Sequence, residues 1–377
     1  MSPGATVDNS DFHIGILCAL PLESRAVRGI FDEIDGFDND SHFTRASTDT
    51  GSYTAGKIGP HSVVLGHLPG MGLVDTANFA QRFLSSFAKL QLVLLVGVCG
   101  GSPRDDKCHE IRLGDVIIGT RAIKSDLGRL YQDGLQSRGG KEDTLGRQSP
   151  EIRGFINKLE SYKHPLRETT ARYLSQLLAK PEFQMSLYPG SDKDKLFNHN
   201  YLHKHYDSKV CQCKHPSKSC DAARETLCNQ LGCDSQHLIQ RNRLQSQVLN
   251  SPALHFGTMA SRDAVIKYAD YREYMFRKEK AIGFDMESAG LWEYLPTVIV
   301  KGVCDYADSH KNNLWQDYAA ASAAACTRAV LDLWDRSPEQ SIASQATHPT
   351  TQFNNSMNTN VVNQSQIANL SNFTLNF

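Results

Sequence analysis

The sequence predicts an α/β fold in which helices flank a central, mostly parallel mixed sheet. Short apolar runs that suit buried strands alternate along the chain with longer segments that suit helices. The run LVLLV at residues 92–96 is apolar at every position, as expected of a strand covered on both faces. Such alternation is typical of a parallel sheet within one α/β domain.

The first expected elements are a strand at residues 13–18 (HIGILC) and a helix that runs to about residue 34, with Pro21 tolerated in its first turn. A strand at 62–66 and a helix at about 73–87 follow. The LVLLV strand is expected to end in a glycine-rich turn at 97–101. Further elements are expected as strands at 113–118 and 253–259, a helical stretch near 152–178 and an alanine-rich helix at about 314–334.

Residues 281–308, AIGFDMESAGLWEYLPTVIVKGVCDYAD, are the stretch around which the remaining elements are arranged. We expect a short strand ending near Asp285, a helix beginning at Ser288, a strand at 297–303 and then an acidic turn. Two carboxylates, Glu287 and Asp305, would lie at the ends of these strands. In open α/β sheets, ligands bind at the carboxyl ends of the strands.

Composition excludes several classes of protein. The chain has 377 residues, with 40 Lys and Arg against 41 Asp and Glu, which lacks the charge excess of a general nucleic-acid binder. It has no apolar run of about 18 residues that would suit a membrane helix, and its first residues do not resemble a signal peptide. We therefore expect a cytoplasmic protein with no membrane partner. Its ten cysteines fit a disulfide scaffold poorly at this length, so most are expected to be reduced.

The predicted organisation is a disordered lead-in at 1–11, one domain at 12–336 and a tail at 337–377. Residues of about 124–251 are polar and irregular, and we interpret them as an insertion or lid carried by the domain. The tail is rich in Asn, Gln, Ser and Thr. That composition is typical of disordered segments prone to β-assembly, so self-association is the expected property of the tail.

Each candidate for chemistry has a structural alternative. Glu23 suits a general base, but acidic residues are also favoured at a helix N-terminus. The glycine-rich turn at 97–101 would offer N–H groups to an anion, or is an ordinary turn. Glu287 would bind a diol, or begins a solvated helix. Asp305 is the strongest candidate, because a carboxylate after a buried strand is desolvated and suits a general acid.

Taken together in this order, IGILCALPLE, LVGVCGG, FDMESAG and CDYAD resemble the nucleoside phosphorylase/nucleosidase superfamily over residues 13–124 and 252–335. The longer pattern HFGTMASRDAVIKYA…FDMESAGL…KGVCDYADSHKNNLWQDYAAASAA resembles the phosphorylase-like domains of fungal immune-type proteins and their ATP-cleaving nucleosidase relatives. The resemblance implies a phosphorylase/hydrolase-like three-layer fold, a small-molecule purine nucleotide as substrate and a homo-oligomer.

The same resemblance implies roles for individual residues. Asp305 would donate a proton to N7 of a purine, Glu287 would hold the 2′ and 3′ hydroxyls, and Glu23 would help to activate the attacking water. Met286 would lie under the sugar. The nucleophile and the base would be lined by the backbone of residues 98–101, which includes Val98, Cys99 and Gly100.

Two departures from the family pattern bear on the reaction. Hexameric phosphorylases carry phosphate-binding arginines after the first strand and before the glycine-rich turn, whereas this chain has none at 19–23 or 94–96. A free phosphate would lack its bidentate partners, which favours hydrolysis over phosphorolysis. Val265 stands where nucleosidases tend to have an aromatic residue against the purine, so Phe256 or Phe284 is expected to take that role.

The insertion bears on the substrate. It carries more basic than acidic residues over 191–245, and Lys195, Arg241 and Arg243 would close over a 5′-phosphate or triphosphate, or belong to a solvated loop. Its cysteines raise the question of zinc. Cys211, Cys213, His215 and Cys220 are too closely spaced, and Cys228 and Cys233 too widely, for the usual paired ligands.

Local packing or a surface disulfide is the competing interpretation of these cysteines, and we expect neither a metal nor a cofactor. The resemblance, together with the basic insertion, implies an ATP nucleosidase that releases adenine and ribose 5-triphosphate, in the manner of an immune or cell-death effector. The alternatives are a phosphate-dependent purine nucleoside phosphorylase and a non-catalytic module that senses nucleotides or assembles.

Overall fold

The computed structural model describes residues 9–34, 46–132, 134–137, 145–207, 211–215, 217–241 and 251–334. Arg243, the first eight residues and the Asn-rich tail lie outside the described residues, so the predictions made for them stay predictions. A short 3-10 helix, η1 (Asn9–Asp11), precedes the first strand.

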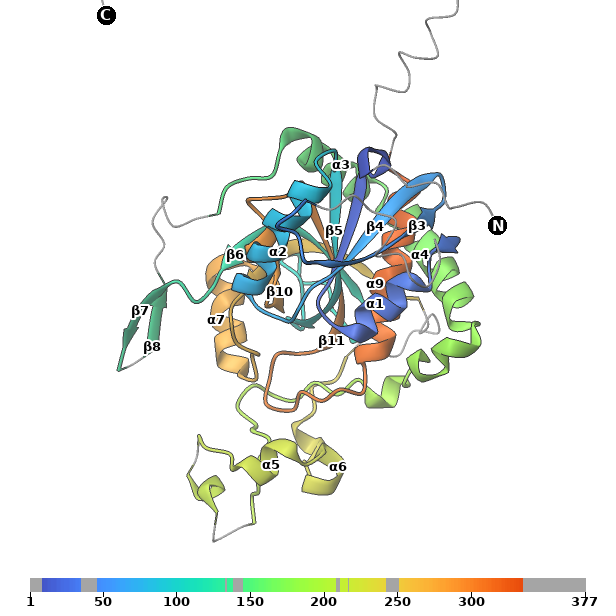
Figure 1. The fold of residues 1–377 in the computed structure, drawn as a ribbon. Coiled ribbons are helices and arrows are strands. Elements are labelled where there is room, and N and C mark those ends of the chain that lie inside the picture. The colour runs from blue at the N-terminus through green and yellow to red at the C-terminus, as the bar shows by residue number, and fades with distance from the viewer. Residues whose placement is uncertain are drawn as a thin grey trace, which may run out of the picture. The chain divides into compact units, whose positions relative to one another are not determined.

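The core of the fold is a nine-stranded sheet with the strand order β10-β9-β6-β11-β5-β1-β4-β3-β2 (Figure 1). β1 lies parallel to both β4 and β5, whereas β11 is parallel to β5 and antiparallel to β6. The sheet is therefore mixed. Its strands are β1 (Ile14–Cys18), β2 (Glu33–Ile34), β3 (Ser52–Ile58), β4 (His61–His67), β5 (Leu92–Gly101), β6 (Val116–Lys124), β9 (Leu254–Ser261), β10 (Ala281–Asp285) and β11 (Thr297–Asp305). A hairpin of β7 (Gly128–Tyr131) and β8 (Gly134–Ser137) forms a separate small sheet.

Part of this sheet closes on itself through β5. β5 pairs with β11 on one side, and near its end it also pairs with β10, where Gly100 and Gly101 lie opposite Phe284 and Gly283. β10, β9, β6, β11 and β5 thus form a ring. The turn predicted at 97–101 is wrong, because these residues continue β5. Glycines tolerate such close approach of neighbouring backbones, so they suit the strand that closes the ring.

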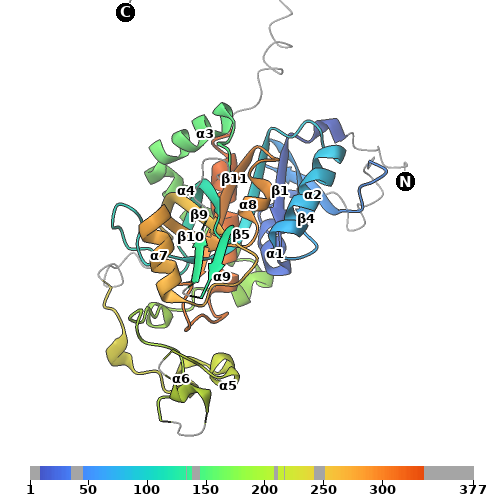
Figure 2. The ribbon, with the colours of Figure 1, turned by 90° about the vertical axis from the view of Figure 1, so that its left-hand side faces the viewer.

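Helices cover both faces of the sheet, as the two views show (Figures 1 and 2). α1 (Pro21–Arg28), α3 (Pro150–Ser161), α4 (Lys163–Leu178) and α9 (Gln316–Leu331) contribute to one apolar core. α2 (Leu73–Ser86), α7 (Ala269–Glu279) and α8 (Ser288–Leu291) contribute to the other. The predicted α/β fold with a mixed sheet and flanking helices is confirmed.

Several predicted boundaries differ from the structure. The first helix ends at Arg28, with Gly29 as its C-cap, and the chain then enters β2 instead of continuing as a helix to residue 34. The helical stretch near 152–178 consists of α3 and α4, which meet at Tyr162. β3 and α7 were not predicted. β3 is half-exposed and α7 has few apolar positions, so neither leaves a strong periodic signal.

The predicted insertion has two structurally different parts. α3 and α4 bury Leu159 and Leu174 in the domain core, so they form part of a helix layer. The Cys/His-rich part lies beyond one end of the sheet in both views (Figures 1 and 2). The helical elements of the Cys/His-rich part are short: η6 (Gln212–Lys214), α5 (Asp221–Glu225), α6 (Cys228–Leu231) and η7 (Ser235–His237). Two further short elements, η4 (Pro181–Ser186) and η5 (Ser191–Lys193), precede it, and η4 buries Phe183 in the domain core. None of the helices in the described parts of the chain has the length and apolar character needed to cross a bilayer.

Candidate active site

One cavity of about 410 Å³ brings the three predicted carboxylates together. Glu23 comes from the start of α1, Glu287 from the connection between β10 and α8, and Asp305 from the end of β11. The remaining predicted residues that line the same cavity are Val98, Cys99, Gly100, Phe284 and Met286, and Val265 lines it as well. Residues more than 280 positions apart in the sequence therefore meet in one place.

Glu23 is held by three backbone N–H groups. Its Oε2 accepts from Ala19 at 3.0 Å and from Leu20 at 2.9 Å, and its Oε1 accepts from Val98 at 2.8 Å. The first two bonds satisfy donors next to the N-terminus of α1, where a carboxylate is favoured. Gly97 is needed for this arrangement, since a Cβ there would overlap the Glu23 carboxylate. Glu23 therefore joins the end of β1 to β5.

Glu287 is paired with a buried lysine. Lys301, in the middle of β11, is 1% exposed, and its Nζ lies 3.1 Å from Glu287 Oε2 and 3.8 Å from Asp285 Oδ2. Burial raises the pKa of Glu287 to about 7, although the Lys301 ammonium favours the ionised form. Burial opposes the charge of Lys301, but the neighbouring carboxylates, Glu287 first, outweigh it and raise the pKa of the lysine.

Asp305 is fixed by the residues that follow it. Its Oδ1 accepts from the N–H of Ala307 at 2.8 Å, and its Oδ2 lies 2.6 Å from Lys311 Nζ and 3.2 Å from the thiol of Cys304. Ala307 has φ of 50°, in the left-handed region that costs a non-glycine residue free energy. A Cβ at Gly100 would lie 2.9 Å from Asp305 Oδ1, so glycine leaves room for the carboxylate.

A second cavity of about 420 Å³ adjoins the first. The two share Cys304, Asp305, Lys311 and Asn313 in their linings. Lys193 and the predicted Lys195 line the second cavity, so three lysines lie in or beside it. Leu227, Cys228 and Asn229 of the Cys/His-rich part form another section of its wall. The second cavity is lined by Asp305 and Asp308 as well, so lysines and carboxylates face the same space.

The structure does not bring Phe256 or Arg241 into either cavity. Phe256 lines a different cavity, beside Lys280. Arg241 is buried; its guanidinium donates to the hydroxyl of Tyr306 at 2.7 Å and to the carbonyl of Ile111. These bonds give Arg241 a structural position in the domain. Of the two aromatic residues expected to contact the purine, Phe284 is the one at the site.

Sequence reasoning missed the two lysines that pair with the site carboxylates. Lys301 interrupts the apolar run TVIVKGVC. A charge within a buried strand requires a partner of opposite charge, so the sequence could have predicted that this lysine pairs with a carboxylate. Lys311 follows Asp305 by six residues in the polar segment SHKNN, where the sequence gives no sign of burial.

A family model described as the phosphorylase superfamily matches residues 13–180. This part of the chain is similar to a phosphorylase-superfamily domain. An NLR-like protein (nucleotide-binding leucine-rich repeat) from Hyaloscypha variabilis is 29% identical over 327 residues, which cover 85% of this chain and 29% of that protein. A 5′-methylthioadenosine/S-adenosylhomocysteine nucleosidase from Mycobacterium bovis is 27% identical over 123 residues, or 33% of this chain and 42% of that enzyme. The chain therefore spans less than half the length of either relative.

Solved structures share the fold. A mutant of the Helicobacter pylori 5′-methylthioadenosine/S-adenosylhomocysteine nucleosidase, with 5′-methylthioadenosine in its active site, gives a TM-score of 0.51 at 13% identity, covering 85% of this chain and 98% of that one. Futalosine hydrolase from the same organism gives 0.50 at 14% identity, with the same coverage. The predicted resemblance to the nucleoside phosphorylase/nucleosidase superfamily is confirmed, and the NLR-like relative comes from a fungus, in line with the predicted resemblance to domains of fungal proteins.

The buried pair between Lys301 and Glu287 predicts a large loss of stability when the lysine is removed. Lys301→Met should lower the free energy of unfolding by about 3–5 kcal/mol, because two carboxylates lose their counter-charge in the protein interior. Urea denaturation followed by circular dichroism measures this loss. Lys57→Met is the matched control, since its pair with Glu33 is exposed and is expected to contribute less than about 1 kcal/mol. Equal losses in the two variants would contradict the assignment.

Proposed function

We propose that this protein hydrolyses the N-glycosidic bond of a purine nucleotide, with ATP as substrate, and releases adenine and ribose 5-triphosphate. The observation that carries the proposal is the meeting of Glu23, Glu287 and Asp305 in one cavity, each with a different hydrogen-bonding environment. Carboxylates in different environments divide acid, base and binding roles among themselves.

In the proposed reaction, the bond between N9 of the base and C1′ of the sugar breaks and its electrons move to the purine. Asp305 in its protonated form delivers a proton to N7 and makes the base a better leaving group, and the Lys311 ammonium at 2.6 Å stabilises the carboxylate that remains. Glu287 accepts hydrogen bonds from the 2′ and 3′ hydroxyls and holds the sugar as positive charge develops on it. A water molecule forms the new bond to C1′ and loses its proton toward Glu23.

Water is the favoured nucleophile because the cavity offers phosphate no bidentate partner. None of the described residues that line it is an arginine. Positions 19–23 and 94–96, where the resemblance to phosphorylases places phosphate-binding arginines, have none either. Glu23, whose carboxylate bonds to the N–H of Val98, occupies the side on which the nucleophile would approach and would repel an anion there.

The adjoining cavity supports a nucleotide as the substrate. Lys193, Lys195 and Lys311 lie in its lining, and lysine ammonium groups bind phosphates as point charges. Asp305 lines both cavities, so a nucleotide with its base at Asp305 would have lysines in the lining of the adjoining cavity. The similarity to an NLR-like protein supports a role for this activity in an immune or cell-death response.

Product analysis with and without phosphate tests the proposed function. ATP, adenosine and 5′-methylthioadenosine are incubated with the protein, and the products are separated by chromatography. We expect free adenine and ribose 5-triphosphate from ATP in phosphate-free buffer. Asp305→Asn should lower kcat by about 10²–10⁴-fold because it removes the acid while keeping the shape. The exposed Asp270→Asn serves as the control. A strict requirement for phosphate would establish phosphorolysis instead.

A nucleotide substrate predicts a selective effect of Lys195→Ala. Loss of one ammonium from the second cavity should raise KM for ATP and leave turnover of adenosine unchanged, because adenosine has no phosphate to bind. Lys218→Ala, an exposed lysine in the same part of the chain, is the matched control. Steady-state kinetics on both substrates provide the measurement. If Lys195→Ala slowed both substrates equally, the second cavity would not be the phosphate site.

The environment of Glu287 predicts a pH dependence. Its pKa of about 7 means that the carboxylate takes up a proton as the pH falls through neutrality, which removes an acceptor for the sugar hydroxyls. The kcat/KM value should therefore decline at acidic pH. Asp285→Asn should move this decline to lower pH, because the Asp285 charge contributes to raising the pKa of Glu287. A profile that is unchanged in Asp285→Asn would contradict Glu287 as the titrating group.

A further inference from the structure

Seven cysteine and histidine side chains between residues 203 and 233 gather into two compact groups. In each group, the nitrogen and sulfur atoms that are able to ligate a metal lie within 4.8 Å of one another. The first group consists of His205, Cys211, Cys213 and Cys220, and the second of His203, Cys228 and Cys233. None of the ten cysteines of the chain, all of which the structure describes, is in a disulfide.

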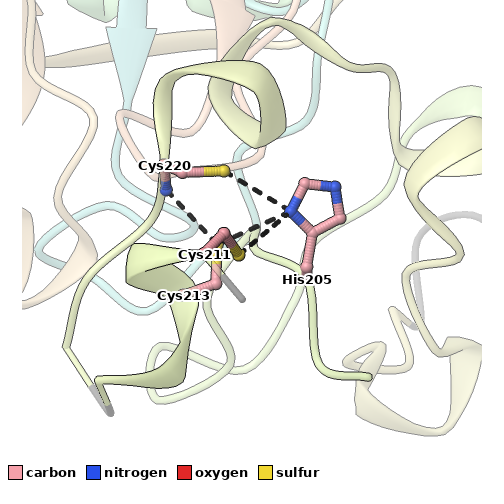
Figure 3. Close-up of side chains that lie close together, drawn as sticks. All are labelled: His205, Cys211, Cys213 and Cys220. Atoms are coloured by element: carbon pink, nitrogen blue, oxygen red, sulfur yellow. Dashed lines mark hydrogen bonds between the residues drawn. The ribbon is translucent and has the colours of Figure 1, made fainter. Parts of the chain in front are cut away.

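The first group converges on a single ring nitrogen (Figure 3). The Sγ atoms of Cys211, Cys213 and Cys220 lie 3.8, 3.7 and 3.4 Å from Nδ1 of His205. One imidazole nitrogen has either one proton or one lone pair, so it cannot form hydrogen bonds with all three sulfur atoms at once. The arrangement requires another explanation.

A tetrahedral zinc ion accounts for these distances. Zinc binds sulfur at about 2.3 Å and histidine nitrogen at about 2.0–2.1 Å, which places neighbouring nitrogen and sulfur ligands of a tetrahedron about 3.5–3.6 Å apart. The three observed separations, 3.4–3.8 Å, bracket that value. We propose that His205, Cys211, Cys213 and Cys220 bind a structural zinc ion, and that His203, Cys228 and Cys233 bind a second one.

The surroundings of the first group suit thiolate ligands. The N–H of Cys220 donates to Cys213 Sγ at 3.3 Å, and the N–H of Ala223 donates to Cys220 Sγ at 3.4 Å. Such bonds to the ligand atoms are the usual support of a metal site. Lys204 donates to the carbonyls of Cys213 and His215, which brings a positive charge beside three thiolates. On binding, each of the three thiols releases its proton to solvent.

The second group has its own evidence. Nδ1 of His203 lies 3.2 Å from Cys233 Sγ and 3.6 Å from Cys228 Sγ, while Nε2 lies 2.7 Å from the carbonyl oxygen of Thr226. A carbonyl only accepts, so Nε2 carries the proton and Nδ1 directs its lone pair toward the two sulfurs. This bond from a ligating histidine to a carbonyl is typical of zinc sites. The three described ligands leave a fourth position for water or another donor.

The segment also lacks a core that would hold it together without metal. Among the described residues from 202 to 240, only His203, Cys213 and Ala223 are buried. Two of these three are proposed ligands. Segments that cannot bury enough apolar surface are commonly organised by disulfides or by metal ions. The ligands of the first site lie in sequence between those of the second, so the two ions would fold the segment as one unit.

The sequence prediction of no metal rested on a spacing rule. That prediction took His215 as the histidine nearest to the cysteines, whereas the structure places His205 on them and leaves His215 exposed, bonded to Ser217. Cys228 and Cys233 find their partner in His203, at the other end of the segment. The cysteines of the first site thus lie between His203 and the two cysteines of the second site.

Metal content and spectroscopy test this proposal on the full chain. Protein purified without chelator should contain about two zinc ions by mass spectrometry. His205→Ala and Cys228→Ser should each lower the content to about one. His215→Ala, which replaces the neighbouring exposed histidine, should leave it at about two. Cobalt exchanged into the protein should give the intense visible bands of tetrahedral thiolate coordination, and these should weaken in His205→Ala.

Thiol titration of the unfolded protein separates the competing interpretations. Ten reactive thiols are expected when zinc is removed by a chelator, because the ten cysteines are reduced. Fewer than ten reactive thiols in the metal-free protein would show that some of these cysteines form disulfides, and this result would overturn the zinc proposal. Zinc content that is the same in His205→Ala as in the parent would overturn the first site. Unchanged content in Cys228→Ser would overturn the second.

Discussion

The buried ammonium of Lys301 is the interaction on which the arrangement of the candidate site depends. It lies in the middle of β11, within the ring of strands, where a lone charge would be strongly unfavourable. Its counter-charges, Glu287 and Asp285, come from the end of β10 and the residues that follow it. The lysine therefore fixes the β10–α8 connection against β11. Because the same charge acts on Glu287, stability and the protonation of a proposed sugar-binding group are coupled.

β5 is the structural reference for all three carboxylates. Glu23 reaches it through the N–H of Val98, and β11 runs parallel to it and ends in Asp305. β10 pairs with its last residues through Gly283 and Phe284, shortly before Glu287. The glycines in β5 leave space for two of these carboxylates, at Gly97 and Gly100. The pairing of β10 with β5 thus closes the ring of strands and also brings the residues of the site together. An open sheet would not bring β10 to β5, since the two strands are distant in the strand order.

The sequence was most informative where short segments carry both the strand and the functional side chain. The ends of β1 and β11, with Glu23 and Asp305, were located from apolar runs followed by acidic residues. It was least informative where partners are distant: the closing of β5 onto β10, the pairing of Lys311 with Asp305 and the burial of Arg241. A linear pattern records composition and spacing, whereas these contacts depend on which strands become neighbours. For the same reason, the structure groups the Cys and His side chains differently from their grouping by sequence spacing.

The residues proposed for catalysis and those proposed for phosphate binding lie in parts of the chain that are stabilised by different interactions. Glu23, Glu287 and Asp305 are held by the sheet and by buried charges, so their geometry follows from the stability of the whole domain. The wall of the second cavity at residues 227–229 belongs to the segment with almost no core of its own. His203 ties that segment to the domain through the hydroxyl of Ser309, which accepts its N–H at 3.0 Å. If zinc orders this segment, loss of metal should disturb the phosphate end of the site first, while the carboxylates keep their positions. Substrate range would then change independently of the bond-breaking chemistry.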